Sequence, residues 1–523
     1  MLLSDRGEAL AQVKDLPMYV KAVHGGDALA KQLLRERRHL AGGRTERSHV
    51  SVQRVQIVIM VVNTSQLHVV SGQDGLFHGL SYVAITYDGD FNLHILFFLK
   101  TAKILFFFLN GKQTSRFFHI FAHYYDNILK TMSVYNFDEI VPRRGTHCVK
   151  HDMLKQFFGT DDLLPMWVAD MDFKTPDFIL DAIRKRCEHE VLGYTFSSDT
   201  YVCAVINWLQ THYGITTQWK NLHFIPGIVQ GIAFVLQAFT QPGDKVLVTT
   251  PVYPPFLNVP HRSGRVFVSS PLHIVDGRFT VDFEDFEEKA KGCKVFILAN
   301  PHNPGGRVWS PEELRRFAEI CHRQHVLVIA DEIHADMTFA PRRHTSFSTV
   351  SDEAFHNSIT LIAPSKTFNM AGLASSVGYV PDPEIKKQFF GFLDANELSL
   401  GNIFAYTAAE AAFRHGEEWR LQLLDYLQAN IDFTEQYLQK HLPKVTMMRP
   451  EASFLIWMDF RALGLSHKEL VDKMLYDAKV GLNSGLDYGP DGEGFMRMNI
   501  GTPKAIVKEA LDRITSALSV YAT

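Results

Sequence analysis

Four short apolar runs rich in β-branched residues constrain the fold of this chain more than any other feature. They are KVLVTTP, KVFILANP, VLVIADE and SITLIAP, at residues 245–251, 294–301, 326–332 and 358–364. Apolar runs without alternation are typical of parallel strands in a sheet that helices cover on both faces. Between the second and third runs, Ser310, Pro311 and Glu313 predict a capping box at the start of an amphipathic helix. A strand, a crossover helix and a strand predict an open α/β sheet.

A polar or aromatic side chain stands at or just past the end of each run. Tyr253, Asn303 and Lys366 follow the first, second and fourth runs, and Asp331 closes the third. Ligands of open α/β sheets bind outside the carboxyl ends of the strands, so one edge of the sheet is predicted to carry all four side chains. Taken singly, Asp331 could pair with an arginine or cap a helix, Asn303 could be a turn residue, and Lys366 could lie on the surface. Together they favour a binding site.

One ligand would use all four groups, and that ligand is pyridoxal phosphate. Asp331 would keep its ring nitrogen protonated, and Asn303 would donate to its phenolic oxygen. Tyr253 would stack on the ring, and Lys366 would form a Schiff base with the aldehyde.

The phosphate of such a ligand needs hydrogen-bond donors, which helix N-termini provide. The stretch 223–239 predicts an apolar helix that starts after Gly227, with Ile228 and Val229 offering backbone N–H groups. Ser365 adds a hydroxyl. A glycine at a helix start is also explained as an ordinary cap, so this signal supports the others and does not stand alone.

Composition limits the class of partner. The chain has 523 residues, long enough for two or more packed domains. Its formal net charge of -4 shows no excess that would indicate nucleic acid or an anionic membrane, so a small molecule is the expected partner. Five dispersed cysteines without a CxxC pair favour a reducing, cytoplasmic location over a disulfide framework. His147 and His151 have helical spacing but no HExxH motif, so no metal site is predicted.

Residues 1–131 differ in character from the rest. Pro17 is their only proline, and apolar clumps such as IVIMVV and ILFFFL show little helical or strand periodicity. We expect an atypical extension: spurious sequence upstream of a true start at Met132, a disordered segment, a small appended domain or a partner-binding extension. The stretch 95–109 contains two lysines and is shorter than the roughly 18 to 20 apolar residues that span a membrane, and the chain start lacks the apolar region of a secretory signal.

From Met132 onward the chain resembles the fold-type I pyridoxal-phosphate enzymes of the class I/II aminotransferase superfamily. The motifs that carry the resemblance are LPMWVADMDF, LGYTF, TPVYPPF, NPHNPGGRVWSPEEL, DEIHAD and SKTFNMAGL. They are most similar to those of the MalY/PatB-type C–S β-lyases, which are cystathionine β-lyase-like enzymes. The resemblance implies a three-layer large domain around a mainly parallel sheet. The implied parts are an N-terminal segment packing with the small domain (132–175), a large cofactor-binding domain (176–420) and a smaller α+β C-terminal domain (421–523).

The resemblance also implies roles for further residues. His334 would lie near the phenolic oxygen of the cofactor. Arg497 would clamp the substrate α-carboxylate, and a surface ion pair is the less favoured alternative. Trp167 would line the substrate side, or be a core tryptophan. Tyr194 would reach the phosphate or substrate of the neighbouring subunit and take part in catalysis, which implies a homodimer with shared sites.

The implied activity is an α,β-elimination on L-cystathionine or a related cysteine S-conjugate, with Lys366 as general base, in sulfur amino-acid metabolism and methionine biosynthesis. The products would be a thiol, pyruvate and ammonia. One departure weakens a transaminase assignment: position 374, where many aminotransferases have a phosphate-binding arginine, is Ala374. The alternatives are a class I/II aminotransferase and a regulatory protein that binds the cofactor and acts through a partner.

Overall fold

The computed structural model describes residues 135–522 and nine strands ahead of them, and the chain divides into two compact units, Met1–Ser133 and Val134–Thr523. The strands of the first unit pair antiparallel in three sheets, β1-β2-β3, β4-β5 and β6-β7-β8-β9. Their bounds are Leu2–Leu3, Glu8–Val13, Leu16–Lys21, Thr45–Val52, Val55–Val62, Leu67–Ser71, Leu80–Tyr87, Asn92–Leu99 and Ile104–Asn110. The hypothetical start at Met132 lies outside the described residues, and the interpretation of 1–131 stays a prediction.

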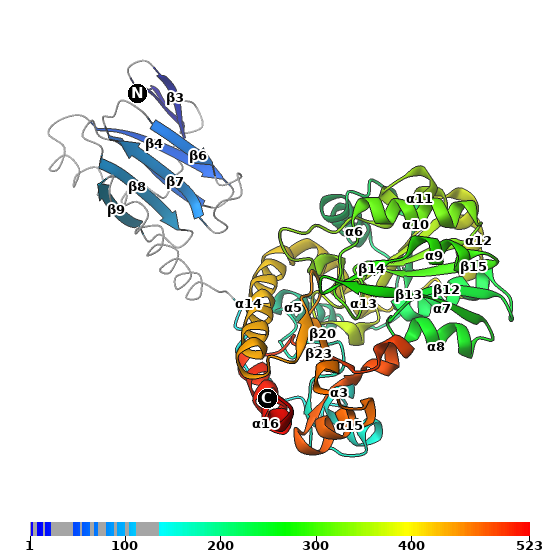
Figure 1. Ribbon diagram of the computed structural model, residues 1–523. Helices are drawn as coiled ribbons and strands as arrows, with labels where there is room; N and C mark the ends of the chain where they lie inside the picture. The colour runs from blue at the N-terminus through cyan, green and yellow to red at the C-terminus, as the bar shows by residue number, and fades with distance from the viewer. Residues whose placement is uncertain are drawn as a thin grey trace. The chain divides into compact units, whose positions relative to one another are not determined.

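The second unit is built on an eight-stranded sheet in the order β11-β18-β17-β16-β15-β12-β13-β14 (Figure 1). The strands from β17 to β13 in this order run parallel, whereas β11, β18 and β14 add antiparallel pairings at the edges. The bounds in chain order are Leu222–Ile225, Lys245–Thr250, Val266–Val275, Arg278–Val281, Cys293–Ala299, Leu327–Asp331, Ser358–Ile362 and Ser376–Tyr379. The predicted α/β class with a mainly parallel sheet is confirmed.

All four predicted apolar runs form neighbouring central strands, namely β12, β15, β16 and β17. Their alternate side chains enter two separate cores, as at Val246 and Leu247, which face opposite sides of the sheet. Helices α7 (Ile228–Phe239), α8 (Pro255–Arg262) and α12 (Pro383–Ala395) cover one side; α9 (Phe283–Ala290) and α10 (Pro311–Arg323) cover the other (Figure 1). Burial on both faces explains why these strands are apolar throughout.

The predicted capping box of α10 is present. The Ser310 hydroxyl accepts from the Glu313 backbone N–H, the Glu313 carboxylate accepts from the Ser310 N–H, and Pro311 is the first helical residue. These contacts satisfy N–H groups that have no partner inside the helix.

A smaller sheet in the order β19-β20-β23-β22 carries the C-terminal part of the unit. Its antiparallel strands span Thr446–Met448, Leu455–Asp459, Phe495–Asn499 and Asn483–Ser484. Strand β10 (Leu164–Pro165), near the start of the unit, pairs in parallel with β21 (Val480–Gly481), so a segment from early in the chain packs on this part.

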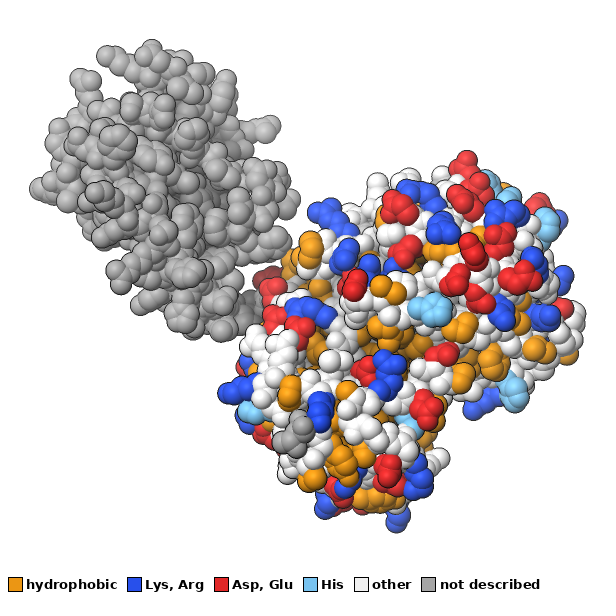
Figure 2. Space-filling model, viewed as in Figure 1, with side chains coloured by type: hydrophobic (Ala, Val, Ile, Leu, Met, Phe, Trp, Pro, Cys, Tyr) orange, Lys and Arg blue, Asp and Glu red, His pale blue; other side chains and the backbone are white. Residues whose placement is uncertain are grey.

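The remaining helices complete the layers around the two sheets. They are α3 (Val149–Asp152), α4 (Leu154–Phe158), α5 (Asp177–Cys187), α6 (Asp199–Tyr213), α11 (Asp352–His356), α13 (Ile403–His415), α14 (Glu417–His441), α15 (His467–Asp472) and α16 (Lys504–Ala522). No helix among the described residues is long and apolar enough to cross a membrane. On the face drawn in Figure 2, acidic and basic side chains of this unit are interspersed.

Candidate active site

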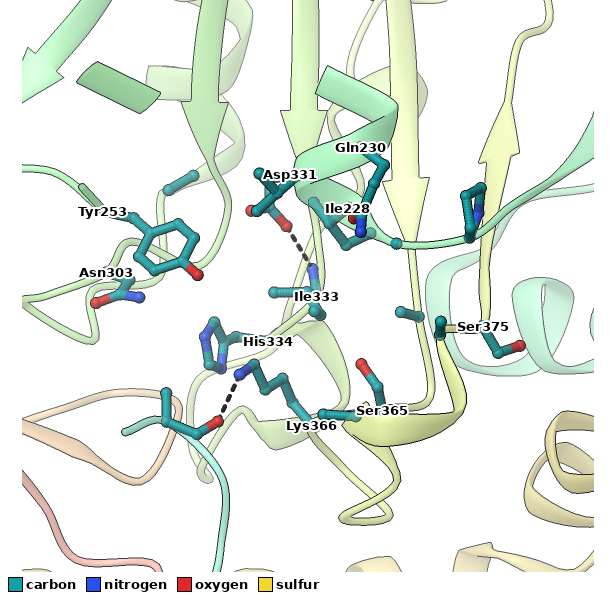
Figure 3. Close-up of a pocket in the computed structure, with 18 of the residues that line it drawn as sticks. Ile228, Gln230, Tyr253, Asn303, Asp331, Ile333, His334, Ser365, Lys366 and Ser375 are labelled. Carbon is teal, nitrogen blue, oxygen red and sulfur yellow. Dashed lines mark hydrogen bonds between the residues drawn. The ribbon is translucent and has the colours of Figure 1, made fainter. Parts of the chain in front are cut away.

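A pocket lies past the carboxyl ends of the central strands, where the sequence predicted a site (Figure 3). Its walls come from the turns after β12, β15, β16 and β17, from the start of α7, and from Ala169 on a segment that precedes α5. The lining residues that the sequence predicted are Gly227, Ile228, Val229, Tyr253, Asn303, Asp331, His334, Ser365 and Lys366. Strand order brings them together, because parallel neighbours present their carboxyl ends at one edge.

Lys366 lines the pocket at the end of the segment that follows β17. Its Nζ donates a hydrogen bond to the carbonyl oxygen of Ala169. Burial and the positive charge of Arg497 lower the pKa of Lys366 to about 8, while Asp170 and Asp331 act in the opposite direction. A lysine with a pKa near neutrality has a substantial fraction of neutral, nucleophilic amine, which Schiff-base chemistry and proton abstraction both require.

Asp331 ends strand β16 and is buried beside the pocket. Its Oδ1 accepts from the backbone N–H of Ile333 at 3.0 Å. Burial raises the pKa of Asp331 to about 7, more than this hydrogen bond and the charge of Lys366 can compensate. A buried carboxyl of this kind favours a cationic neighbour, because an opposite charge offsets the solvation that the carboxylate loses.

Asn303 is oriented by Arg497. Its Oδ1 accepts from Arg497 Nη1 at 3.3 Å, which leaves the Nδ2 group of Asn303 available to donate elsewhere. The turn that carries Asn303 requires glycine at position 306, where φ is +66° and an added Cβ would lie 2.9 Å from the Ala452 carbonyl oxygen.

Arg497 is almost fully buried on β23, behind Asn303. Its Nη2 donates to the carbonyl oxygen of Trp167 at 2.8 Å and to Asn483 Oδ1 at 2.7 Å. Within residues 135–522 its hydrogen bonds all go to neutral oxygens, and its Nε has no partner. A buried guanidinium without a hydrogen-bonded carboxylate is suited to bind one from a ligand.

His334 and Tyr253 line the same side of the pocket as Asn303 (Figure 3). Burial and the charges of Lys366 and Arg497 lower the pKa of His334 to about 3, so its imidazole is neutral. Its Nδ1 has no hydrogen-bond partner among the described residues. Burial raises the pKa of Tyr253, so its phenol is protonated.

The other end of the pocket offers hydrogen-bond donors. Helix α7 begins at Ile228 after Gly227, and the N–H groups of its first turn have no partner inside the helix. Ser365 and Ser375 line this region, and the buried Ser375 hydroxyl has no partner among the described residues. Ala374 lines it too and contributes no charge, so the helix N-terminus and the hydroxyls are the groups suited to an anion here.

Two predicted residues lie away from these side chains. Tyr194 is fully exposed, at 103% of the reference area, in a stretch before α6. The Trp167 ring packs on Phe157 and Phe158, with centroids 4.8 and 5.1 Å away, and its indole N–H donates to the Lys150 carbonyl at 2.9 Å. Neither ring is part of the pocket wall, and neither is Arg497. Arg497 donates to the Trp167 carbonyl and to Asn303, which does line the pocket.

Sequence reasoning missed several pocket residues, among them Ala169, Gln230, Ile333 and Ser375. Gln230 and Ile333 lie within two residues of predicted positions, so the strand-end argument could have included them. Ala169 carries no chemical signal of its own, because only its backbone carbonyl contacts Lys366.

Residues 162–514 match the family model for aminotransferases of class I and II, and the chain belongs to this family. Its second unit therefore has the fold-type I architecture of pyridoxal-phosphate-dependent transferases.

Individual relatives within the family allow a more specific comparison than the family model does. The chain is 45% identical to cystathionine β-lyase PatB of Bacillus subtilis, over 73% of this chain and 100% of that protein. A pyridoxal-phosphate-bound chain from Clostridium difficile 630, assigned as an aminotransferase, is 39% identical with a TM-score of 0.72, over 73% of this chain and 100% of that one. The pyridoxal-phosphate-bound C–S lyase of Staphylococcus hominis is 33% identical with a TM-score of 0.69, over 74% and 99% of the two chains.

Proposed function

We propose that this protein is a pyridoxal-phosphate-dependent C–S β-lyase of the cysteine-S-conjugate type. It cleaves L-cystathionine or a related cysteine S-conjugate to a thiol, pyruvate and ammonia. The observation that carries the proposal is that the Lys366 amine and the Asp331 carboxyl line one pocket, in a chain 45% identical to a cystathionine β-lyase. The Arg497 guanidinium donates to Asn303, another residue of that pocket wall.

The pocket fits pyridoxal phosphate on three observations. The buried carboxyl of Asp331 makes no ion pair among residues 135–522, and a protonated pyridine nitrogen would provide one. The Nδ1 atom of His334 and the hydroxyl of Ser375 are buried polar atoms that have no hydrogen-bond partner in the described part of the chain. The start of α7 presents free backbone N–H groups to a phosphate. Tyr253, Asn303 and Lys366 would then hold the ring, its phenolic oxygen and its aldehyde carbon.

When bound, pyridoxal phosphate supplies an electron sink that stabilises negative charge at the substrate Cα. Asp331 supports this function by keeping a positive charge on the ring nitrogen. Arg497 binds the substrate α-carboxylate and fixes which Cα bond faces the pocket. The free amine of Lys366 removes the Cα proton, for which its lowered pKa is suited. A thiolate then leaves from Cβ, and the C3 fragment is released as pyruvate and ammonia after hydrolysis.

The products separate a lyase from a transaminase. Purified protein with L-cystathionine and pyridoxal phosphate, but no keto-acid acceptor, should form pyruvate, ammonia and homocysteine in equal amounts. Lys366→Ala serves as the inactive control. Pyruvate formation that depends strictly on an added acceptor would instead assign the protein as an aminotransferase.

We propose a homodimer in which each subunit contributes to its partner's site. Four exposed residues support this, because the stretch that holds Val191, Leu192, Tyr194 and Phe196 is apolar and each side chain is more than half exposed. A partner copy that covers this stretch would place the Tyr194 hydroxyl near the phosphate or the substrate. We further propose that the protein acts in the cytoplasm, since all five of its cysteines are free thiols.

A further inference from the structure

Residues 168–173 form an irregular segment at the edge of the pocket. Ala169 lies within it, and the Ala169 carbonyl is the acceptor for the Lys366 amine. Neither a helix nor a strand holds this segment in place. Other contacts must therefore fix the position of a carbonyl on which a reactive amine depends.

Asn499 supplies such contacts from strand β23. Its Nδ2 donates to the carbonyl oxygens of Val168 at 2.6 Å and Asp170 at 2.7 Å, which flank Ala169 in the chain. Its Oδ1 accepts from the Gly501 N–H at 2.8 Å. Asn499 is completely buried, so the amide has both N–H groups committed and no freedom to rotate.

Arg497 lies two residues before Asn499 and on the same face of the strand. Arg497 donates a hydrogen bond to the carbonyl of Trp167, and Asn499 donates to those of Val168 and Asp170. Of these four consecutive carbonyls, only that of Ala169 is left to face Lys366. One strand therefore holds both the guanidinium expected to bind the substrate and the backbone that contacts the amine.

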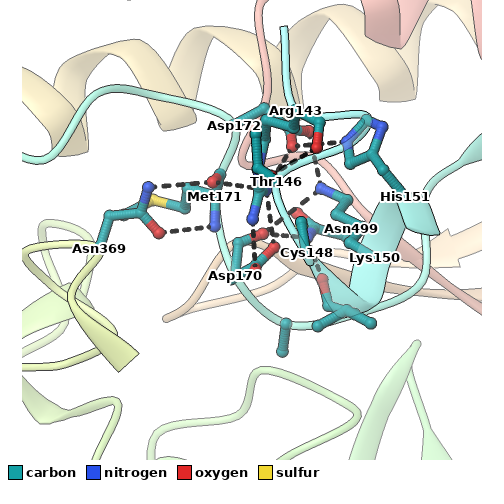
Figure 4. Close-up of polar contacts among 12 residues, drawn as sticks. Arg143, Thr146, Cys148, Lys150, His151, Asp170, Met171, Asp172, Asn369 and Asn499 are labelled. Atoms are coloured by element: carbon teal, nitrogen blue, oxygen red, sulfur yellow. Dashed lines mark hydrogen bonds and ion pairs between the residues drawn. The ribbon is translucent and has the colours of Figure 1, made fainter. Parts of the chain in front are cut away.

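A charge cluster also holds the segment (Figure 4). Arg143 pairs with both carboxylate oxygens of Asp170, at 3.0 and 2.7 Å, and with Asp172 at 2.7 Å. The buried Lys150 pairs with the other oxygen of Asp172 at 2.7 Å. His151 Nε2 lies 3.4 Å from Asp172 Oδ1 as well. The cluster therefore anchors the segment through both of its carboxylates, and the charge of Asp170 still acts on Lys366.

We propose that Asn499 is a positioning residue that holds the Ala169 carbonyl against the amine of Lys366 and thereby fixes the direction of the amine lone pair. A primary amine that donates one N–H to a fixed acceptor loses rotation about its Cε–Nζ bond. Its lone pair then points in a restricted direction, as proton abstraction from a held substrate requires. The inference rests on the proposed function only in taking Lys366 as the reacting amine.

The test is competitive labelling of the full chain with acetic anhydride after removal of the cofactor. Labelling of the Lys366 peptide, followed by mass spectrometry across pH, reports both the protonation midpoint and the reactivity of this one amine. Asn499→Ala should move the Lys366 midpoint by about half a pH unit or more, equivalent to about threefold in its protonation equilibrium. An amine released from Ala169 should also label at a changed rate.

Asn430→Ala is the matched control. Asn430 on α14 is equally buried, and its Nδ2 donates to two carbonyls, those of Ile500 and Thr502, both at 3.0 Å. Its loss removes the same kind of bonds without touching residues 168–170, so the Lys366 midpoint should remain that of the wild type. Equal midpoints for the wild type, Asn499→Ala and Asn430→Ala would overturn the proposal, and so would equal shifts in both variants.

Asn499→Ser keeps one donor and should give a smaller shift in the same direction. If Asn499→Ala does not fold, an unchanged midpoint in Asn499→Ser contradicts the proposal by itself. Because labelling requires no turnover, the two proposals fail separately. A wild-type protein without lyase activity would refute the proposed function, and an insensitive Lys366 would refute the positioning role of Asn499.

Discussion

At the scale of single residues, the site is defined by two opposite pKa shifts in neighbouring groups. Burial raises the pKa of Asp331 to about 7 and, with Arg497, lowers that of Lys366 to about 8. Near neutral pH, both groups are therefore close to losing their charges in the protein without cofactor. Each charge favours the other, but too weakly to offset the cost of burial. A bound cation beside Asp331 and a covalent partner for Lys366 would relieve both costs.

Asp331→Asn should stabilise the cofactor-free protein above pH 7. The folded pKa of Asp331 is raised, so the folded state holds a proton that the unfolded state releases from about pH 4 upward, and stability falls until about pH 7. Asparagine has no such cost, and its advantage should reach at least about 1 kcal/mol there and vanish below pH 4. Urea unfolding at pH 4, 6 and 8 measures it. An advantage that does not depend on pH would contradict the assigned titration.

Arg497→Lys should weaken substrate use strongly although the charge is kept. Arg497 already donates to Asn303, Trp167 and Asn483, and an ammonium has only three N–H donors, so a lysine could not keep these bonds and also bind a substrate carboxylate. Loss of one charge-assisted bond costs about 1.5–3 kcal/mol, or roughly 10- to 100-fold in kcat/KM. Steady-state kinetics with L-cystathionine measures the change. Arg461→Lys is the control, since Arg461 pairs with Asp459 near the surface. If the two variants behave alike, Arg497 does not bind the carboxylate.

At the scale of elements, a helix can stabilise the site without lining the pocket, and α10 is the example. Helix α10 buries Leu314, Phe317 and Cys321 against the sheet face opposite α7. The connection from β15 to β16 starts at the pocket, with the turn that carries Asn303. The capping box fixes the start of the helix that follows this turn.

Ser310→Ala should lower the free energy of unfolding by about 1 kcal/mol, since it removes the side-chain acceptor for the Glu313 N–H. KM should stay the same, because Ser310 does not line the pocket. Denaturant titration measures the stability, and Ser519→Ala, at an exposed position of α16, provides the comparison. Equal losses in the two variants would show that the cap does not contribute.

At the scale of the whole molecule, the exposure of Tyr194 bears on how copies of the chain assemble. Its ring is far more accessible than a large aromatic side chain normally is, and it lies in an apolar stretch. A shared site in a symmetric dimer explains both facts, because each subunit would bury this stretch against its partner.

Mixing two inactive variants tests the shared site. Lys366→Ala and Tyr194→Ala, unfolded together and refolded, should recover about a quarter of the wild-type activity, because half of the random dimers are mixed and each has one intact site. Each variant refolded alone is the control. Activity that does not rise on mixing would place Tyr194 in the site of its own chain or remove it from catalysis.

The local sequence determined much of the pocket. Strands β12, β15, β16 and β17 and the capping box of α10 depend on neighbouring residues, and parallel pairing then places Tyr253, Asn303, Asp331 and Lys366 at one edge. The edge strands β11, β18 and β14 pair antiparallel with partners that no local pattern specifies. They remained outside the prediction for this reason.

Only the tertiary structure decided what surrounds Lys366. Asn499 reaches Val168 across 331 positions of the chain, and Lys366 reaches Ala169 across 197. Such contacts are made by backbone carbonyls, which every residue has, so no residue type marks them in a sequence. Side-chain chemistry at strand ends can be read from the order of residues, whereas the backbone that orients this chemistry is set only when distant segments pack.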